Sequence, residues 1–211
     1  MDPIIERFLE SCGYRYFEAK RLIIRQGESA DTLFYITQGS VTVLLELHQG
    51  QDLVLAYLQA GDFFGELGLF NHAVRRSASV YAYTPCEIAC IDYEKLRNLP
   101  LYPELMPILA SQVARRLRNT NRKVGDMAFA SVSGRILRTL LDLSQGPEAR
   151  THPRGTQIRI TRKELGRIVG CSREVAGRVL KRLEREGLIS TRGRTVILLE
   201  EGSRHKPSVT R

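Results

Sequence analysis

The first half of the chain is a series of short apolar or alternating runs separated by turn residues. The runs are Leu22–Ile24, Thr32–Ile36, Ser40–Leu47, Leu53–Leu58, Ser79–Tyr83 and Glu87–Ile91. Glycine-centred turns lie between them, for example at Gln38-Gly39 and Ala60-Gly61-Asp62. Many short strands joined by such turns are typical of an antiparallel sandwich or barrel, and we expect one here.

The period of the apolar positions changes after Pro103. Apolar residues then recur every three or four positions, which predicts one long helix with a narrow apolar seam. The seam consists of Met106, Leu109, Val113, Leu117, Thr120, Val124 and Met127. At 3.6 residues per turn the seam runs for roughly seven turns, so it suits pairing with a second copy of the chain. Packing against its own domain is the alternative.

A break at Ala128–Ser131 separates this helix from a second amphipathic helix, predicted over Val132–Ser144. The next segment, Gln145–Gly155, contains two prolines and two glycines and is predicted to be a linker.

Two short helices joined by a tight turn follow the linker. Thr161 with Glu164 three residues later forms a capping box that starts the first helix, and Gly170 ends it. Ser172 caps the second helix, predicted over Arg173–Glu186, which has an apolar face and a basic outer face. Such a pair is what a reader of the DNA major groove requires, whereas a helical hairpin with a solvated charged face is the alternative.

The outer face carries side chains suited to reading bases. Arg173 and Arg178 can donate bidentate hydrogen bonds to guanine, and Glu174 can accept one from a cytosine amino group. Other basic residues are expected to contact phosphates. The candidate DNA-binding residues are Arg173, Glu174, Arg178, Lys163, Arg167, Ser172 and Lys181, with Arg182 as a further phosphate contact. Leu188–Leu198 reads as a hairpin around Arg192-Gly193, which would form a wing beside the helices.

The charge of the chain is divided unevenly between its halves. Residues 1–101 contain 9 Lys and Arg and 13 Asp and Glu, a net charge of −4, whereas residues 102–211 contain 23 and 10, a net charge of +13. A basic half beside an acidic half indicates a polyanionic partner for the basic half, and nucleic acid is the commonest one. A solvated basic surface without a partner is the alternative.

Composition excludes several other classes. Hydrophobic residues make up 43% of the chain and charged residues 26%, as in a folded globular protein. No signal-peptide or membrane-spanning segment is evident, so we expect a cytoplasmic protein that does not engage a membrane. The four cysteines, Cys12, Cys86, Cys90 and Cys171, have no metal-ligand spacing, so we expect reduced thiols and no metal site.

Two segments resemble a known family. Ile158–Glu184 closely resembles the winged helix-turn-helix of the cyclic AMP receptor protein family, within the CRP/FNR superfamily of bacterial transcription regulators. Gly61–Phe70, with Arg76-Ser77-Ala78, resembles the phosphate-binding cassette of that family. The resemblance runs from about Phe8 to Leu199.

The resemblance implies an α+β chain with three parts. They are a cyclic nucleotide-binding β-barrel (jelly roll) over residues 1–101, a dimerisation helix and hinge over residues 102–130, and a winged helix-turn-helix over residues 131–211. It also implies a homodimer that binds a palindromic operator in double-stranded DNA and contacts RNA polymerase.

The cassette suits a nucleotide with one phosphate charge and one free ribose hydroxyl. Gly65 and Gly68 let the backbone approach a ligand, while Arg76 and Ser77 donate to phosphate. Glu66 can accept from a ribose 2′-hydroxyl. Taken alone, these residues favour a tight turn with a solvated arginine. The resemblance favours Gly65, Glu66, Leu67, Arg76 and Ser77 as ligand-binding residues, with cyclic AMP as an allosteric ligand and no other cofactor.

The family also meets the adenine with two polar residues of the long helix, which fall on Thr120 and Asn121. The second position is usually serine or threonine in the best-known relatives, so Asn121 is a departure. Cyclic GMP and cyclic dinucleotides such as cyclic di-GMP are therefore alternative ligands. Constitutive DNA binding, without any ligand, is a further alternative.

The resemblance also concerns contacts with RNA polymerase. The segment Ala149–Gly155 matches a loop that contacts RNA polymerase, whereas Gly13, Arg15 and Glu46 keep little of the family's other contact surfaces. Basic residues of the tail Glu201–Arg211 could contact phosphate, or the tail could be a frayed terminus. The regulatory subunit of an enzyme is another alternative, but the four histidines lie apart and no catalytic constellation is present, so we expect no enzyme activity.

Overall fold

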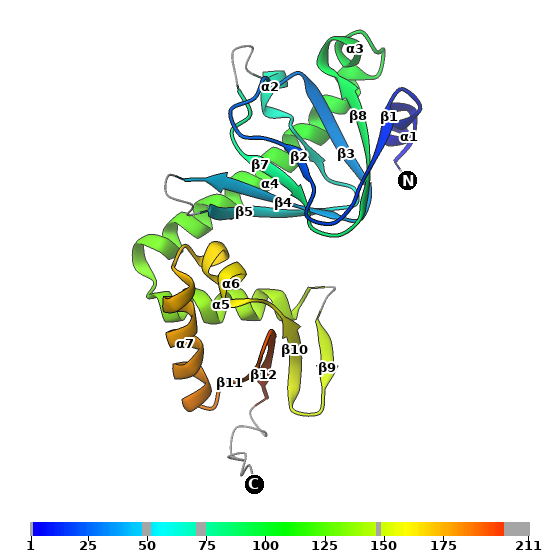
Figure 1. Ribbon diagram of the computed structural model, residues 1–211. Coiled ribbons are helices and arrows are strands. Elements are labelled where there is room, and N and C mark those ends of the chain that lie inside the picture. The colour runs from blue at the N-terminus through cyan, green and yellow to red at the C-terminus, as the bar shows by residue number, and fades with distance from the viewer. Residues whose placement is uncertain (1, 48–51, 71–74, 147–148, 201–211) are drawn as a thin grey trace. The chain divides into compact units, whose positions relative to one another are not determined.

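The computed structural model describes residues 2–47, 52–70, 75–146 and 149–200 (Figure 1). The chain divides into two compact units, residues 1–122 and 123–211. The tail Glu201–Arg211 and its suggested phosphate contacts lie outside the described residues. Within the described ranges, no helix is both long enough and apolar enough to cross a bilayer.

The first unit contains most of the strands. Its elements are α1 (Pro3–Glu10), β1 (Gly13–Phe17), β2 (Leu22–Ile24), β3 (Thr32–Gln38), β4 (Ser40–Glu46), β5 (Asp52–Gln59), β6 (Phe63–Phe64), α2 (Leu67–Phe70), β7 (Ser79–Ala82), β8 (Cys86–Asp92), α3 (Tyr93–Arg97) and most of α4 (Tyr102–Phe129). The strands form two four-stranded antiparallel sheets with the orders β1-β8-β3-β6 and β2-β7-β4-β5. Together with the second unit, they confirm the α+β class.

Strand β3 is buried on both faces, which explains its continuous apolar run. Phe34 and Ile36 belong to the core that also contains residues of the β2-β7-β4-β5 sheet. Leu33 and Tyr35 point the other way, into a core that they share with helices α1, α3 and α4. Successive side chains of a strand point to opposite faces, so β3 contributes to both cores.

The long helix α4 divides its apolar seam between two environments. Leu109 is fully buried in the core of the first unit, so the alternative of packing against its own domain is correct for this position. Farther along the helix, Leu117 and Val124 are each 59% exposed. Pairing with a second chain stays a prediction for these exposed positions.

The second unit packs helices against one face of a small sheet. Its elements are the end of α4, α5 (Val132–Ser144), β9 (Arg150–His152), β10 (Gly155–Arg159), α6 (Arg162–Val169), α7 (Arg173–Arg185), β11 (Ile189–Arg192) and β12 (Thr195–Leu199). The sheet has the order β11-β12-β10-β9, and its core includes Ile158 and Val196 from the sheet and Ile136, Leu165 and Leu180 from the helices.

Most elements of the second unit agree with the sequence prediction, with one correction. Helix α5 has the predicted bounds, and the β11–β12 hairpin turns at Gly193 as expected. The predicted linker is partly wrong, because Arg150–His152 pairs with the start of β10. Its Pro153 and Arg154 form the turn of a hairpin and do not belong to an irregular linker.

Candidate functional site

The turn after β6 depends on a glycine. Gly65 has a φ of +76°, a conformation that L residues with a side chain rarely adopt. A Cβ atom at this position would lie 2.7 Å from Nη1 of Arg76. The chain therefore needs glycine here both for the backbone angle and for the approach of Arg76.

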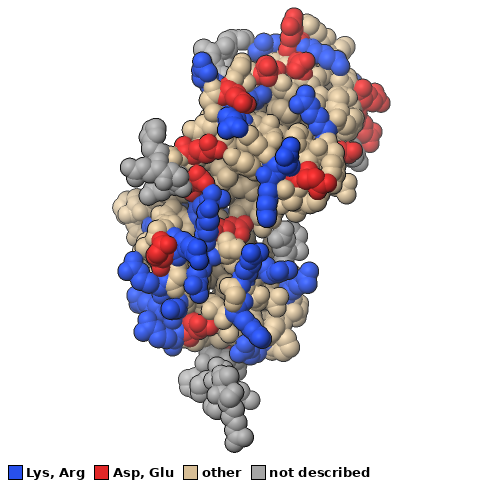
Figure 2. Space-filling view, in the orientation of Figure 1, with Lys and Arg blue, Asp and Glu red and all other residues tan. Residues whose placement is uncertain are grey.

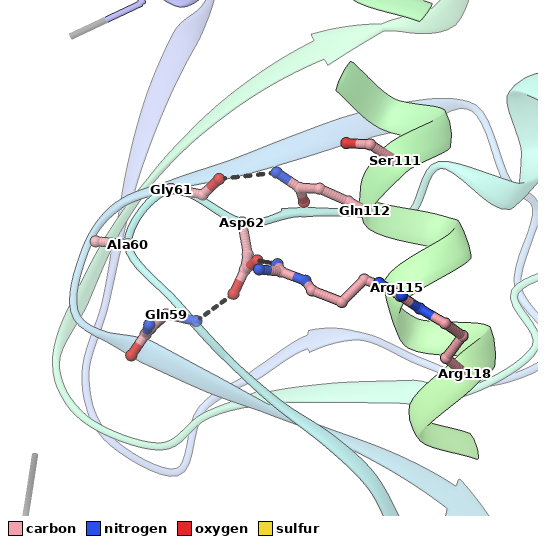
Figure 3. A pocket seen from close by; sticks show the side chains of 8 residues that line it. All are labelled: Gln59, Ala60, Gly61, Asp62, Ser111, Gln112, Arg115 and Arg118. Carbon is pink, nitrogen blue, oxygen red and sulfur yellow. Dashed lines mark hydrogen bonds and ion pairs between the residues drawn. The ribbon is translucent and has the colours of Figure 1, made fainter. Parts of the chain in front are cut away.

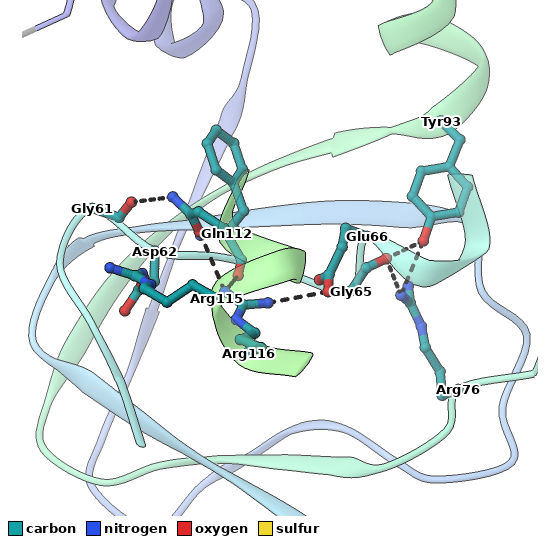
Figure 4. A network of polar contacts seen from close by, with 10 residues as sticks. Gly61, Asp62, Gly65, Glu66, Arg76, Tyr93, Gln112, Arg115 and Arg116 are labelled. Carbon is teal, nitrogen blue, oxygen red and sulfur yellow. Dashed lines mark hydrogen bonds and ion pairs between the residues drawn. The ribbon is translucent and has the colours of Figure 1, made fainter. Parts of the chain in front are cut away.

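Arg76 is a buried cation held by several acceptors (Figure 4). Its Nη1 donates to the Gly65 carbonyl oxygen at 3.1 Å and to the Tyr93 hydroxyl at 3.3 Å, and its Nη2 donates to the Thr32 carbonyl oxygen at 3.0 Å. Asp31 lies 3.6 Å from Nη2 and is well exposed. These contacts hold the guanidinium against the Gly65 turn. Among the residues that the structure describes, Nε of Arg76 has no acceptor, so this N–H is available to an anion.

Glu66 is the buried acceptor on the same turn. The residue is 7% exposed, and its Oε1 lies 3.1 Å from Nη1 of Arg116 on α4. Arg116 also donates to the Phe63 carbonyl oxygen and, at 3.3 Å, to Oε1 of Gln112. Within the described residues, Nε of Arg116 is buried without a hydrogen-bond partner. The ion pair therefore gives the buried Glu66 carboxylate a cationic partner. One N–H donor of Arg116 is left without an acceptor among the described residues.

Helix α4 also holds the preceding turn. Gln112 accepts from the Phe63 backbone N–H at 2.9 Å and donates to the Gly61 carbonyl oxygen at 3.0 Å. Arg115 donates to Oδ1 of Asp62 at 2.6 Å, and Oδ2 accepts from the Gln59 backbone N–H at 3.0 Å. Two adjacent arginines of one helix thus hold two carboxylates of the loop that carries Glu66.

Gly68 has a packing role that the sequence did not reveal. A Cβ atom there would lie 2.7 Å from the Tyr93 ring and 2.9 Å from Cβ of Ala30. The missing side chain therefore makes room for Tyr93, and the approach of a ligand to this glycine stays a prediction. Burial raises the pKa of Tyr93, so its hydroxyl stays protonated and donates to the Gly65 carbonyl oxygen.

The structure brings some predicted ligand-binding residues together and leaves others apart. Gly65, Glu66 and Arg76 gather at one turn, whereas Ser77 is exposed and Leu67 is 45% exposed beside them. Thr120 and Asn121 are exposed on α4, and neither side chain has a hydrogen-bond partner among the described residues. Ligand binding by all seven residues stays a prediction.

Sequence reasoning missed the residues that support the turn: Asp62, Tyr93, Gln112, Arg115 and Arg116. The spacing of the arginines along α4 says nothing about loop residues about 50 positions earlier in the chain. The signal in the sequence is the pair of adjacent arginines, Arg115 and Arg116, beside the apolar seam.

The two helices of the second unit are joined as the capping residues predict. Thr161 Oγ1 accepts from the Glu164 backbone N–H at 3.1 Å, and Ser172 Oγ accepts from the Val175 backbone N–H at 3.3 Å. Gly170 ends α6 with a φ of +71°. At Gly166, a Cβ atom would lie 2.6 Å from the Cys171 carbonyl oxygen, so the chain folds back over a glycine.

The outer face of α7 presents acid and base side by side. Glu174, Arg178 and Lys181 are exposed and recur at intervals of four and three, so they share one side of the helix. Hydrogen bonds from its own backbone N–H and from the Ser172 side chain lower the pKa of Glu174. Its carboxylate stays ionised and can accept from a base. Arg173 is exposed at the start of the helix.

The other predicted DNA-contacting residues differ in their exposure and in the contacts that they already make within the protein. Lys163 is exposed, whereas Arg167 is half-buried. Arg182 forms an ion pair with Glu186 at 2.7 Å along α7, which competes with a phosphate contact. Glu184 accepts from the backbone N–H of Thr191 at 2.6 Å and so ties strand β11 of the wing to α7. DNA contact by any of these residues stays a prediction.

Basic side chains gather over the second unit. On the face shown in Figure 2, Lys and Arg predominate over the unit of residues 123–211, while the first unit presents both signs of charge. This agrees with the division of charge along the sequence. A surface of this kind attracts a polyanion.

Comparison with known proteins gives two family models and many relatives. A cyclic nucleotide-binding domain matches residues 14–100, and a Crp-like helix-turn-helix domain matches residues 134–202. The "cAMP-activated global transcriptional regulator CRP" of Salmonella typhimurium is 51% identical over 93% of this chain and 94% of its own length. Vfr of Pseudomonas aeruginosa, named in the same way, is 52% identical over 92% of each chain.

Solved structures of similar fold also belong to transcription regulators of this kind. The c-di-GMP responsive global regulator CLP of Xanthomonas campestris superposes with a TM-score of 0.90 and 44% identity, covering 93% of this chain and 98% of that chain. A CRP/FNR-family transcriptional regulator of Thermus thermophilus superposes with a TM-score of 0.76 and 26% identity, covering 91% and 96%. With a nucleotide-binding cassette, a capped helix-turn-helix and relatives at about half identity over nearly the whole length, this chain belongs to the CRP/FNR family of transcription regulators.

Proposed function

We propose that this protein is a homodimeric, sequence-specific DNA-binding transcription regulator whose allosteric ligand is cyclic AMP. The observation that carries the ligand assignment is the Gly65 turn, which holds a buried carboxylate, Glu66, and a buried guanidinium, Arg76, at one place. Cyclic AMP would supply a phosphate for Arg76 and a ribose hydroxyl for Glu66. The curated relatives at about half identity are named as cAMP-activated regulators, not as enzymes.

The described contacts divide the work at this site between residues. Arg116 and Gln112 orient Glu66 and its loop from α4, and Tyr93 supports the Gly65 turn from the other side. A ligand on this turn therefore contacts groups that are already tied to α4. We infer that ligand binding biases α4 and the short break at residues 130–131 that follows it, and through them the presentation of α7 to DNA.

Dimer formation through α4 is supported by its exposed apolar side chains. Leu117 and Val124 are each 59% exposed, and Phe129 is 94% exposed. Such residues are costly to leave in water along one helix and suit a second α4. Two copies would place two α7 helices on the half-sites of a palindrome, about 34 Å apart. We place the protein in the cytoplasm with DNA, and the β9–β10 hairpin, which includes Ala149–Gly155, at RNA polymerase.

Calorimetry on the purified chain tests the ligand directly. Cyclic AMP, cyclic GMP and cyclic di-GMP are titrated separately into wild type and into Glu66→Gln, which keeps the side-chain shape but removes the charge. We expect cyclic AMP to bind most tightly and to lose at least about tenfold in affinity in the variant. Preferential binding of cyclic di-GMP would contradict cyclic AMP as the ligand and make this protein similar in ligand to the Xanthomonas regulator. If none of the three nucleotides binds, the proposal of a cyclic nucleotide ligand is wrong.

DNA binding is then measured by fluorescence anisotropy with and without the ligand that calorimetry identifies. We expect the ligand to tighten operator binding and, by thermodynamic reciprocity, the operator to tighten ligand binding by the same factor. Equal DNA affinities in both conditions would contradict the allosteric part of the proposal and support constitutive binding.

A further inference from the structure

A polar pocket lies next to the loop that carries Glu66. Its volume is about 490 Å³, and it lies between the β5–β6 turn and α4 (Figure 3). The turn contributes Gln59, Ala60, Gly61 and Asp62, and the helix contributes Ser111, Gln112, Arg115 and Arg118. None of the predicted cyclic nucleotide ligands lines it. Pockets that bind small molecules typically enclose ~300–1,000 Å³, so this one has a suitable size.

The pocket has more cationic donors than the protein uses. Arg115 and Arg118 are three residues apart on α4, so their side chains share one side of the helix. A guanidinium carries five N–H donors, and the described contacts of Arg115 use only the one to Asp62. Arg118 is exposed and has no hydrogen bond or ion pair within the described ranges of the chain. The two side chains can therefore donate to an anion together.

The single carboxylate of the pocket does not oppose such an anion strongly. Asp62 is 9% exposed, and both of its oxygens accept hydrogen bonds, Oδ1 from Arg115 and Oδ2 from the Gln59 backbone N–H. Its charge is matched by Arg115, so Arg118 remains as an unmatched positive charge at the pocket. Paired guanidinium groups with fork geometry are the preferred protein partners of a phosphoryl dianion.

We propose that this pocket is a second ligand site that binds the phosphoryl group of a small anion through Arg118 and the free edge of Arg115. Inorganic phosphate and small phosphate esters share this chemistry. Gln59 and Ser111 on the pocket wall can add hydrogen bonds, and the volume leaves room for the organic part of an ester.

The site is connected to the cassette through α4. Arg115, Arg116 and Arg118 lie within four positions of one helix, and the first two of them pair with the carboxylates of Asp62 and Glu66. An anion on Arg118 reduces the repulsion among these cations and so stabilises the docking of α4 on the loop. Gln112 takes part in both places, because it lines the pocket and accepts from Arg116. The phosphoryl ligand therefore favours the arrangement that positions Glu66, and this coupling rests on the proposed function.

Backbone NMR of the full-length chain without cyclic nucleotide tests the site itself. Inorganic phosphate or glycerol 3-phosphate is titrated against sodium chloride of matched ionic strength, and the amide signals of Gly61 and Asp62 are followed. A local signal is needed because the basic second unit also attracts phosphate. We expect saturable shifts in wild type, an affinity lowered at least about tenfold in Arg118→Ala and a smaller loss in Arg118→Lys. Arg97→Ala on α3 is the control for charge and should match wild type.

The outcomes separate this site from the cassette. Binding of either anion with dependence on Arg118 supports the site, and comparison of the two identifies the source of the phosphoryl group. No saturable shift at Gly61 and Asp62, or shifts unchanged in Arg118→Ala, would overturn it. In a second titration, cyclic AMP should bind more tightly when phosphate is present, and only if Arg118 is intact. If cyclic AMP does not bind at all while the phosphate shifts persist, the proposed function fails and the pocket stands.

Discussion

Replacing Arg116 with methionine removes the cation that faces a buried carboxylate while keeping much of the side-chain volume. Glu66 then has no charged partner, and the Phe63 carbonyl oxygen and Gln112 also lose a donor. Breaking a fully buried ion pair by removing one partner costs about 3–5 kcal/mol. The Glu66 and Arg116 side chains are 9% and 21% exposed, so water retains some access and we reduce the expected loss to about 2–3 kcal/mol.

Urea unfolding at fixed chain concentration measures this loss, followed by circular dichroism because the chain has no tryptophan. A double-mutant cycle with Glu66→Gln isolates the pair, and we expect a coupling of ~1–3 kcal/mol, since the double variant no longer contains an unmatched buried charge. Arg122→Met, at an exposed position on the same helix, should change stability by less than about 0.5 kcal/mol. If Arg116→Met is no more harmful than Arg122→Met, or if the two losses simply add, the assigned role of the pair is refuted.

Three further predictions concern the second unit and one thiol. Gly166→Ala places a Cβ atom 2.6 Å from a backbone carbonyl oxygen of the turn and should lower the free energy of unfolding in urea by about 1–3 kcal/mol. Gly125→Ala is the control, because open space surrounds that glycine, and it should raise this free energy by roughly 0.5–1 kcal/mol. Equal effects of the two substitutions would contradict the packing argument. In binding assays with single-base operator variants, Glu174→Ala should relax the preference for one base pair. Lys163→Ala should instead weaken binding to all operator sequences alike and lower the slope of log affinity against log salt concentration by about 1. Uniform weakening of binding by both substitutions would contradict the base-reading role of Glu174. Burial raises the pKa of Cys12 from 9.0 to about 12, so the thiol stays protonated at pH 9–10 in the folded protein and ionises in the unfolded one. The contribution of this thiol to stability is therefore complete below pH 9 and declines above it. Mass spectrometry should find that iodoacetamide alkylates Cys12 much more slowly in native protein than in urea-unfolded protein.

Residues whose structural role is local were predictable from the sequence. Thr161 and Ser172 cap helices through backbone groups three residues away, so their spacing alone identifies α6 and α7. The basic outer face of α7 follows from the helical period in the same way. In the cassette, the sequence indicated Gly65, Glu66 and Arg76, and the structure places these three at one turn.

Residues whose role depends on contacts distant in sequence were not predictable. Arg116 lies 50 positions from Glu66 and meets it only because Leu105 and Leu109 bury α4 against the first unit. The same packing gives Leu109 a place in the unit's own core, although its spacing equally suited a dimer seam. Gly68 makes room for a tyrosine, which no local pattern reveals.

Composition and neighbours within a few residues suffice to predict the separation of charge between the halves and the helix-turn-helix, because both are local properties of the chain. Only long-range packing shows which groups hold Glu66 and Arg76 in place and that Arg150–His152 is a strand. It also shows that Arg118 lies at a pocket with no partner among the described residues. The physical reason is that a buried charge, a strand pairing or a cavity exists only once distant segments pack together, and their complementarity is not written in any one of those segments.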